Sequence, residues 1–168
     1  MKSFREHKDR ITMCTFSPNL KQIVSSSMDG IVLSTNLKAN SRANKFVGHT
    51  GPVYGVSINP SNSLIASCSR DATIRIWNNN ASARSNTLKG HSAPIKSVEF
   101  NPDGRLLVSA SDDKLVKMWS VEDLKFLASF SGHQNWVKCA QFSSDSRMIA
   151  SGSDDRTVRI WDITHGSK

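Results

Sequence analysis

The sequence predicts an all-β protein built from four copies of one unit of 42 residues. Two observations carry this prediction: residues of one type recur at a fixed step, and the runs between them alternate apolar and polar side chains. The step of 42 residues separates four histidines, His7, His49, His91 and His133. A fixed period between about 20 and 50 residues is the sequence signature of repeat architectures.

Other residue types keep the same step, so four units fill the 168 residues. The aspartates of this series are Asp29, Asp71, Asp113 and Asp155. One series of serines is Ser25, Ser67, Ser109 and Ser151, and a second series lies two residues further on, at Ser27, Ser69, Ser111 and Ser153. Tryptophan occupies one matching position in three of the units, at Trp77, Trp119 and Trp161.

Each unit is predicted to form four short strands. The first follows the histidine, where Val53–Ile58 alternates with the period of two that a half-buried strand shows. Turn residues such as "NPSNS" end it. A second apolar run ends in small residues ("LIASCS"), an aspartate-containing tight turn follows, and the third run ends in tryptophan ("TIRIW"). A looser fourth run, such as Lys125–Phe130, leads to the next unit.

Composition limits the classes of partner. The formal net charge of +8, from 22 basic and 14 acidic residues, favours an acidic partner. The basic residues are spread along the chain rather than clustered, which makes a nucleic-acid partner unlikely. No apolar run is long enough for a membrane helix, so no membrane partner is expected. The three cysteines are widely spaced and predict buried small side chains rather than a zinc site.

The stretch "SGSDDRTVRIWD" (Ser151 to Asp162), with His133 upstream, contains the residue types of a hydrolase triad. The same constellation recurs in every unit, whereas a catalytic site occurs once. The sequence also has no phosphate-binding loop and no metal-ligand spacing. We therefore expect no enzyme activity: no catalytic, cofactor-binding or metal-binding residues, and no cofactor.

A Gly-His pair, about 28 residues, and then a strand ending in Trp or Trp-Asp is the pattern of the WD40 repeat, and this chain resembles that family over its whole length. The resemblance implies an all-β WD40 β-propeller with four 42-residue repeats of four-stranded blades. We expect a single propeller region, 1–168, with repeats at about 7–48, 49–90, 91–132 and 133–168. Residues 1–6 would supply the fourth strand of a split blade.

The resemblance also implies a hydrogen-bonded tetrad in each blade, running from Asp to His, from His to Ser, and from Ser to the Trp ring N–H. The tetrads expected in the last three units are His49, Ser67, Asp71 and Trp77; His91, Ser109, Asp113 and Trp119; and His133, Ser151, Asp155 and Trp161. Both serines of each pair have the same strand phase, so the sequence leaves open which one completes the tetrad.

The first unit departs from the pattern, because Thr35 stands where tryptophan belongs and Glu6 replaces the glycine before His7. We expect this blade to be looser and to lie at an edge or an interface. Three arrangements stay open. The chain forms part of a seven-bladed propeller, or an open arc that pairs with a second repeat chain, or a ring closed on itself.

In this family the residue before each turn aspartate and the loop before the innermost strand face the narrow end of the channel. The candidate partner-binding residues are therefore Met28, Arg70, Asp112, Asp154, Trp136 and Arg10. Trp136 stands out, because an exposed tryptophan is a common hot-spot residue. Packing against the neighbouring blade is the other interpretation of Trp136.

A narrower resemblance rests on "FSPNLKQIVSSSMD", "SRANKFVGHTGPVY" and "HQNWVKCAQFSSDSRMIASGSDDRTVRIWD". These segments are similar to the proteome-of-centriole family, WD-repeat proteins of centrioles and basal bodies, over the N-terminal part of its propeller. That resemblance implies a non-catalytic scaffold of centrioles, basal bodies or axonemes that stabilises microtubule assemblies in the cytoplasm and cytoskeleton. The implied partners are tubulin or centriolar components.

Basic residues that could face acidic tubulin are Lys38, Arg42 and Lys45, which could equally be ordinary solvated side chains. The alternative function is a generic WD40 adaptor in a signalling, ubiquitin-ligase or RNA-processing complex.

Overall fold

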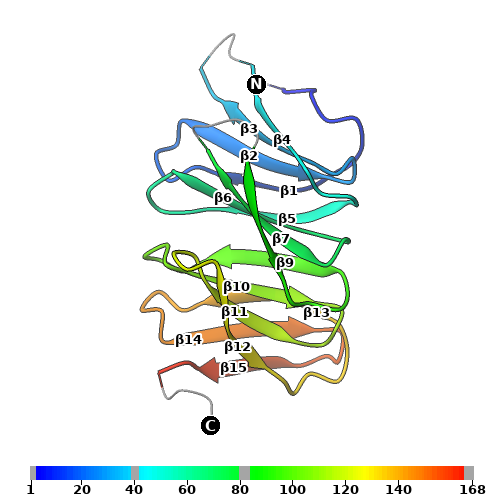
Figure 1. Ribbon diagram of the computed structural model, residues 1–168, viewed down its shortest axis with the longest axis vertical. Helices are drawn as coiled ribbons and strands as arrows, with labels where there is room; N and C mark the ends of the chain where they lie inside the picture. The colour runs from blue at the N-terminus through cyan, green and yellow to red at the C-terminus, as the bar shows by residue number, and fades with distance from the viewer. Residues whose placement is uncertain (1–2, 39–41, 80–83, 165–168) are drawn as a thin grey trace.

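A computed structural model describes residues 3–38, 42–79 and 84–164, and Figure 1 shows its architecture. These residues form fifteen strands in four antiparallel sheets, with no helix among them. Within the same ranges no helix is long and apolar enough to cross a bilayer. The all-β fold that the alternating pattern predicts is confirmed.

The first two sheets have four strands each, and neighbours in sequence pair side by side. We call the sheets blades 1 to 4 in chain order. Blade 1 consists of β1 (Ile11–Phe16), β2 (Gln22–Ser27), β3 (Ile31–Asn36) and β4 (Asn44–Val47). Blade 2 consists of β5 (Val53–Ile58), β6 (Leu64–Ser69), β7 (Thr73–Asn78) and β8 (Ser85–Lys89).

The third sheet repeats this order, and the fourth has three strands among the described residues. Blade 3 consists of β9 (Ile95–Phe100), β10 (Leu106–Ser111), β11 (Val116–Ser120) and β12 (Lys125–Phe130). Blade 4 consists of β13 (Val137–Phe142), β14 (Met148–Ser153) and β15 (Val158–Asp162).

The tight turn between the second and third strand of each blade has a fixed backbone form. The residue after the turn aspartate adopts a positive φ in all four blades, at Gly30, Ala72, Lys114 and Arg156. Within blade 2 the turn is closed by a hydrogen bond from the Ala72 N–H to the Ser69 carbonyl oxygen. Residues other than glycine are uncommon in this left-handed region. We therefore expect the aspartate that anchors the turn to stabilise this backbone conformation.

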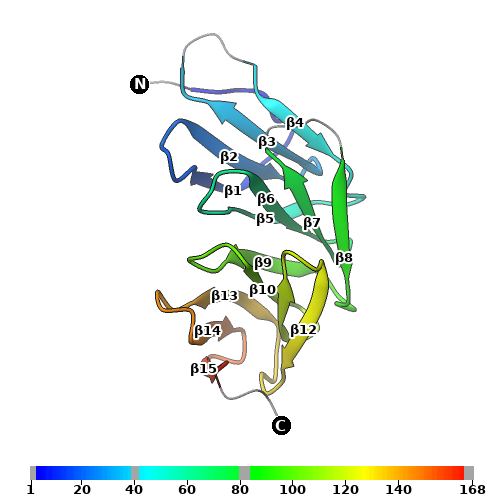
Figure 2. The same cartoon turned by 60° about the vertical axis from the view of Figure 1, so that its left-hand side comes forward.

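The four blades stack face to face, and the core lies between them (Figure 2). One apolar cluster joins blades 1 and 2, including Phe46 and Trp77. A second joins blades 2 and 3 around Trp119. A third joins blades 3 and 4 around Phe130, with Trp161 packed against it. Each blade therefore buries its apolar residues against its sequence neighbours.

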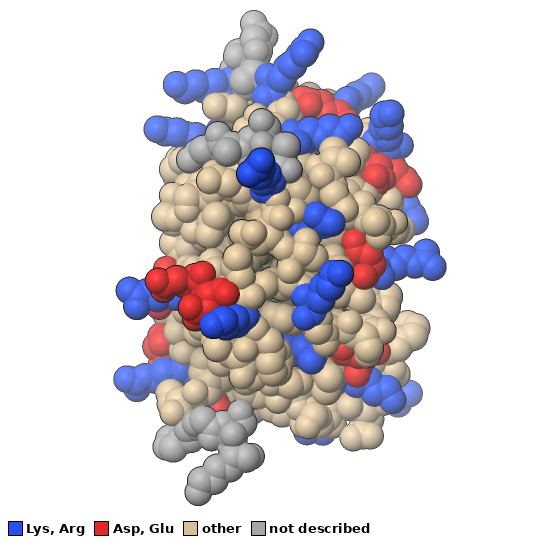
Figure 3. Space-filling model, viewed as in Figure 1, with Lys and Arg blue, Asp and Glu red and all other residues tan. Residues whose placement is uncertain are grey.

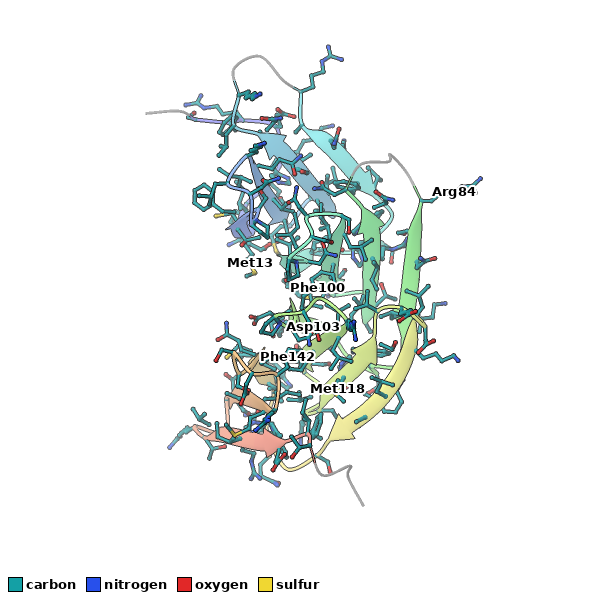
Figure 4. The ribbon with its side chains drawn as sticks, turned by 90° about the vertical axis from the view of Figure 1, so that its left-hand side faces the viewer. Met13, Arg84, Phe100, Asp103, Met118 and Phe142 are labelled. Carbon is teal, nitrogen blue, oxygen red and sulfur yellow. The ribbon has the colours of Figure 1, made fainter. Side chains whose placement is uncertain are left out.

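The first strands of the blades, β1, β5, β9 and β13, lie next to one another. A groove of about 530 Å³ runs along them, from Met13 on β1 to Gln141 on β13. Figure 4 shows Met13, Phe100 and Phe142 on this inner side of the arc, and Arg84 on the opposite side. The groove is the part of a propeller channel that four blades enclose.

The blades form an open arc, with the two ends of the chain at opposite ends of the stack (Figure 1). Residues 3–6 form no strand and lie over the outer face of blade 1, where Phe4 lines a cavity with Ile11 and Thr35. Within one copy, then, residues 3–6 do not supply the expected fourth strand of the last blade, because the arc holds them far from β15. The four blades formed by the described residues do not close into a ring.

Candidate functional site

The residues expected to form a tetrad in blade 2 meet in the structure. His49 Nε2 lies 2.9 Å from Ser67 Oγ, and His49 Nδ1 lies 2.8 Å from Asp71 Oδ2. The Trp77 indole N–H donates to Ser67 Oγ at 2.8 Å. Because the Asp71 carboxylate can only accept, the ring proton of neutral His49 lies on Nδ1, and Nε2 accepts from the Ser67 hydroxyl, whose oxygen also accepts the indole N–H.

The same arrangement recurs in the next two blades. His91 lies 2.6 Å from Asp113 and 2.8 Å from Ser109, which accepts from the Trp119 N–H at 2.9 Å. The fourth blade repeats these contacts at 2.7, 2.8 and 2.8 Å with His133, Asp155, Ser151 and Trp161. In each of these blades the first serine of the pair lies between the histidine and the tryptophan and completes the tetrad.

The second serine of each pair has a different task. In blade 2 the Ser69 hydroxyl donates to the Gly51 carbonyl at 3.2 Å and accepts from the Asp71 N–H at 3.1 Å. The equivalent Ser111 and Ser153 make the same two kinds of bond. These serines tie the tight turn to the loop that precedes the first strand.

The turn aspartate of blade 2 accepts further hydrogen bonds from the Thr50 and Thr73 backbone N–H groups and the Thr73 hydroxyl. Burial alone would raise the pKa of Asp71, but the bonds from Thr73, His49 and Thr50 outweigh it and lower the pKa to about 2. The pKa of Asp29, Asp113 and Asp155 is lowered in the same way, by hydrogen bonds that outweigh burial. Burial lowers the pKa of His49, although Asp71 opposes the shift. The pair is thus a neutral histidine and a carboxylate.

A nucleophilic serine must be reachable by its substrate, and these serines are not. Ser67 and Ser109 are fully buried, and Ser151 is 2% exposed. Each Oγ already accepts the indole N–H. In blades 2 to 4 the group therefore has the residue types of a hydrolase triad but a serine that is closed to a substrate.

Blade 1 keeps three members of the group. His7 lies 3.1 Å from Asp29 and 2.9 Å from Ser25. Where the indole would lie, beside Thr35, there is a cavity of about 200 Å³. Its lining residues are Phe4, Glu6, His7, Ile11, Cys14, Ile23, Ser25, Leu33 and Thr35.

Two of the candidate partner-binding residues form ion pairs within the chain. Lys96 Nζ lies 3.1 Å from Asp112, whose side chain is 10% exposed, and it also stacks over the Tyr54 ring. Lys138 Nζ lies 2.9 Å from Asp154 and 5.0 Å from the centre of the Trp136 ring. Asp112 is therefore largely withdrawn from a partner, whereas the Asp154 pair stays accessible, with side chains about two-fifths exposed.

The other candidates differ in exposure. Trp136 is 48% exposed and so keeps about half of its surface for a partner. Arg10 and Arg70 are exposed, and Met28 is half-buried. Of the basic residues near β4, Lys38, Arg42 and Lys45 are all exposed. Figure 3 shows Lys and Arg side chains scattered over one face, with several around the end that carries blade 1.

The groove along the first strands holds one carboxylate, Glu99, that the repeat pattern does not mark. Burial raises the pKa of Glu99, opposed by a hydrogen bond with Gln141. The equivalent residues in the other blades are Thr15, Ser57 and Gln141. A departure from the repeat on a channel-facing strand was the only sequence signal for Glu99.

Three four-stranded sheets and one three-stranded sheet, stacked and each carrying this His–Ser–Asp group, define a protein of the β-propeller repeat class. The family model of the WD domain, G-beta repeat, matches residues 1–33, 40–78, 83–120 and 124–162. The chain belongs to this WD40 family, whose repeats indicate a protein-interaction scaffold.

Among curated proteins the chain is similar to centriolar relatives over a short segment. It is 49% identical over 43 residues to POC1 centriolar protein homolog B of Xenopus laevis, which is 26% of this chain and 9% of that protein. It is 46% identical over 43 residues to POC1 centriolar protein homolog A of Xenopus tropicalis, and 45% identical over 46 residues to homolog B of Mus musculus. The matches span about a tenth of the length of these relatives.

Proposed function

We propose that this chain is a non-catalytic protein-binding scaffold that acts at centrioles, basal bodies or axonemes, where it stabilises microtubule assemblies. The observation that carries the binding role is the rim of blade 4. Trp136 is half exposed there, beside the accessible Lys138–Asp154 pair. An aromatic ring next to a charged pair provides both the apolar area and the orientation that a hot spot needs. The tetrads hold this rim in place.

The location within the cell rests on the similarity to centriolar proteins and on charge. Relatives named as centriolar proteins share 45 to 49% identity with this chain over the matched segments. The net charge of +8 favours an acidic surface such as that of tubulin. Exposed Arg10 of blade 1 and Arg70 of blade 2 occupy the loop positions equivalent to Trp136 and Asp154, and they add to the attraction.

A generic adaptor in a signalling, ubiquitin-ligase or RNA-processing complex is the second candidate. One observation favours it: the WD40 match extends over four repeats, whereas the centriolar matches cover about a quarter of the chain. An adaptor would use the same rim and would have no preference for microtubules.

Co-sedimentation of the purified chain with microtubules tests the proposal. We expect binding that weakens as salt is added, and that drops several-fold in Trp136→Ala. Leu127→Ala is the matched control, because Leu127 is also about half exposed (46%) but lies on β12, away from the rim. Absence of microtubule binding, together with salt-sensitive binding to RNA, would overturn the cytoskeletal proposal and favour the adaptor.

A further inference from the structure

The outer face of blade 4 carries apolar side chains at positions that are buried in the other blades. Ile74 and Ile76 on β7 are 0% and 3% exposed, because blade 3 covers them. One repeat further on, Val116 is buried under blade 4. Two repeats on from Ile74 and Ile76, Val158 and Ile160 are 74% and 61% exposed. This face has the composition of a blade interface without a blade on it.

The outer face of blade 1 is the complementary surface. At the interface of blades 1 and 2, Phe46 of β4 packs on Trp77, with ring centres 5.6 Å apart. Phe4 stands one repeat before Phe46 and Thr35 one repeat before Trp77, and both line the same cavity. Residues 3–6 thus already lie over blade 1 where the outer strand of a preceding blade would lie.

The edge of blade 4 completes the match. β15 pairs with β14 on one side, and no strand pairs with its other side among residues 3–38, 42–79 and 84–164. In blades 1 to 3 a fourth strand occupies that place. A blade 4 placed on the outer face of another blade 1 would cover Val158 and Ile160 and bring β15 beside residues 3–6.

We propose that two copies of this chain associate head to tail, with blade 4 of one copy on blade 1 of the other. The occupant is a second copy because both halves of the interface, the exposed apolar face and the unpaired outer segment, are present on the same chain. The contact uses different surfaces on the two partners, so the assembly keeps one free blade 1 and one free blade 4. Further contacts of the same kind form until these two free blades meet. This inference does not rest on the proposed function.

The repeat identifies side chains that would touch across the contact. Between blades 3 and 4 the Ala140 N–H donates to Ser97 Oγ at 3.1 Å. One repeat on from Ser97 is Cys139, and one repeat on from Ala140 is position 14 of a following copy, since four repeats of 42 make 168 residues. Cys139 of one copy is therefore expected beside Cys14 of the second copy. Both cysteines are exposed in the single chain and Cys68 is buried, so the burial predicted for the three cysteines is wrong for Cys14 and Cys139.

A short bismaleimide cross-linker tests this pairing, because it joins two exposed thiols without any oxidant. The wild-type chain is expected to give a cross-linked dimer, or a ladder of multiples that uses the same contact. Cys14→Ser and Cys139→Ser should each give no cross-linked product alone, and an equal mixture of the two should give a dimer. Cross-linking of either single variant to itself would overturn the proposal, because it would show a contact between like ends.

Analytical ultracentrifugation of the uncross-linked chain gives an independent readout. We expect a species of twice the monomer mass or more, and a monomer for the double variant Val158→Asp and Ile160→Asp. Leu127→Asp, an equally drastic change on the interior blade 3, should leave the association unchanged. Circular dichroism of the monomeric variant checks that it is folded. The inference is overturned if the wild-type chain stays monomeric at its highest soluble concentration and gives no cross-link. These faces would then belong to contacts with other blades.

Discussion

Blades 1 and 2 share the His, Ser and Asp side chains of the tetrad and differ at its fourth position, which is Thr35 in blade 1 and Trp77 in blade 2. His7 keeps its contacts with Asp29 and Ser25 at 3.1 and 2.9 Å, against 2.8 and 2.9 Å for the corresponding contacts of His49. The hydrogen bonds among His, Ser and Asp therefore do not need the indole. What the indole adds is volume between blades: Trp77 is buried against Phe46, whereas Thr35 leaves a cavity.

The largest expected effect comes from removing that volume in blade 2. Trp77→Ala should lower the free energy of unfolding by about 3–5 kcal/mol, because it opens a cavity at the interface and leaves Ser67 without its donor. Thr35→Ala, the same position in blade 1, should cost roughly 1 kcal/mol or less. Urea titration followed by circular dichroism measures both. Equal losses would contradict the comparison.

The next effect tests the shared part of the group. Asp71→Ala should cost about 2 kcal/mol, because it leaves the His49 Nδ1–H and the Thr50 N–H without an acceptor. Asp29→Ala should cost less, since the His7–Asp29 contact is longer and no tryptophan completes the group above it. Thermal unfolding of the two variants side by side measures the difference. A larger loss in blade 1 would show that its group is not the weaker one.

The free energy of unfolding should also fall in two steps as the pH is lowered. For a single blade, each step should be smaller than the losses above. The pKa of His49 is lowered from 6.5, so below that pH the unfolded chain takes up protons that the folded chain resists. The pKa of Asp71 is lowered from 3.8 to about 2, so a second loss follows between those values. The melting temperature measured from pH 8 to pH 2 tests this, and Asp71→Asn should weaken the lower step. A constant melting temperature from pH 7 to pH 5 would contradict the first step.

The smallest expected effect is a gain. Thr35→Trp should stabilise blade 1 by about 1 kcal/mol, because the cavity is in place and Ser25 Oγ lies where the indole N–H would donate. Thr35→Phe serves as the control that fills volume without a donor. A destabilised Thr35→Trp would show that Phe4 or Leu33 already occupies the space that the ring requires.

The strands followed from the sequence, because the period aligns four copies of one alternating pattern, whereas the residue sets of the tetrads followed from the resemblance to the WD40 repeat. The predicted Val53–Ile58 matches β5 residue for residue. The choice between Ser67 and Ser69 did not follow, since both point to the same side of β6. Only the position of the strand relative to His49 and Gly51 separates their partners.

The ion pairs at the rim were not predicted from the sequence. Lys96 and Asp112 are on different strands and turns, and their contact depends on the pairing of β9 with β10. The arc shape could not be derived either, because the repeat specifies how one blade meets the next but not how many blades meet. Phe4 was assigned to the last blade by register, and the open arc leaves it at the first.

The three apolar clusters have a consequence for how the chain unfolds. Each cluster joins only two adjacent blades, so the stability of the stack is close to a sum of blade terms and nearest-neighbour terms. Within a single copy, the two terminal blades each have one neighbour, and the two inner blades have two. Opening should then spread inward from the ends, and backbone amides of β6 and β10 should exchange with solvent more slowly than those of β2 and β14. The stack would open from both ends, and its slowest-exchanging region would lie at its centre.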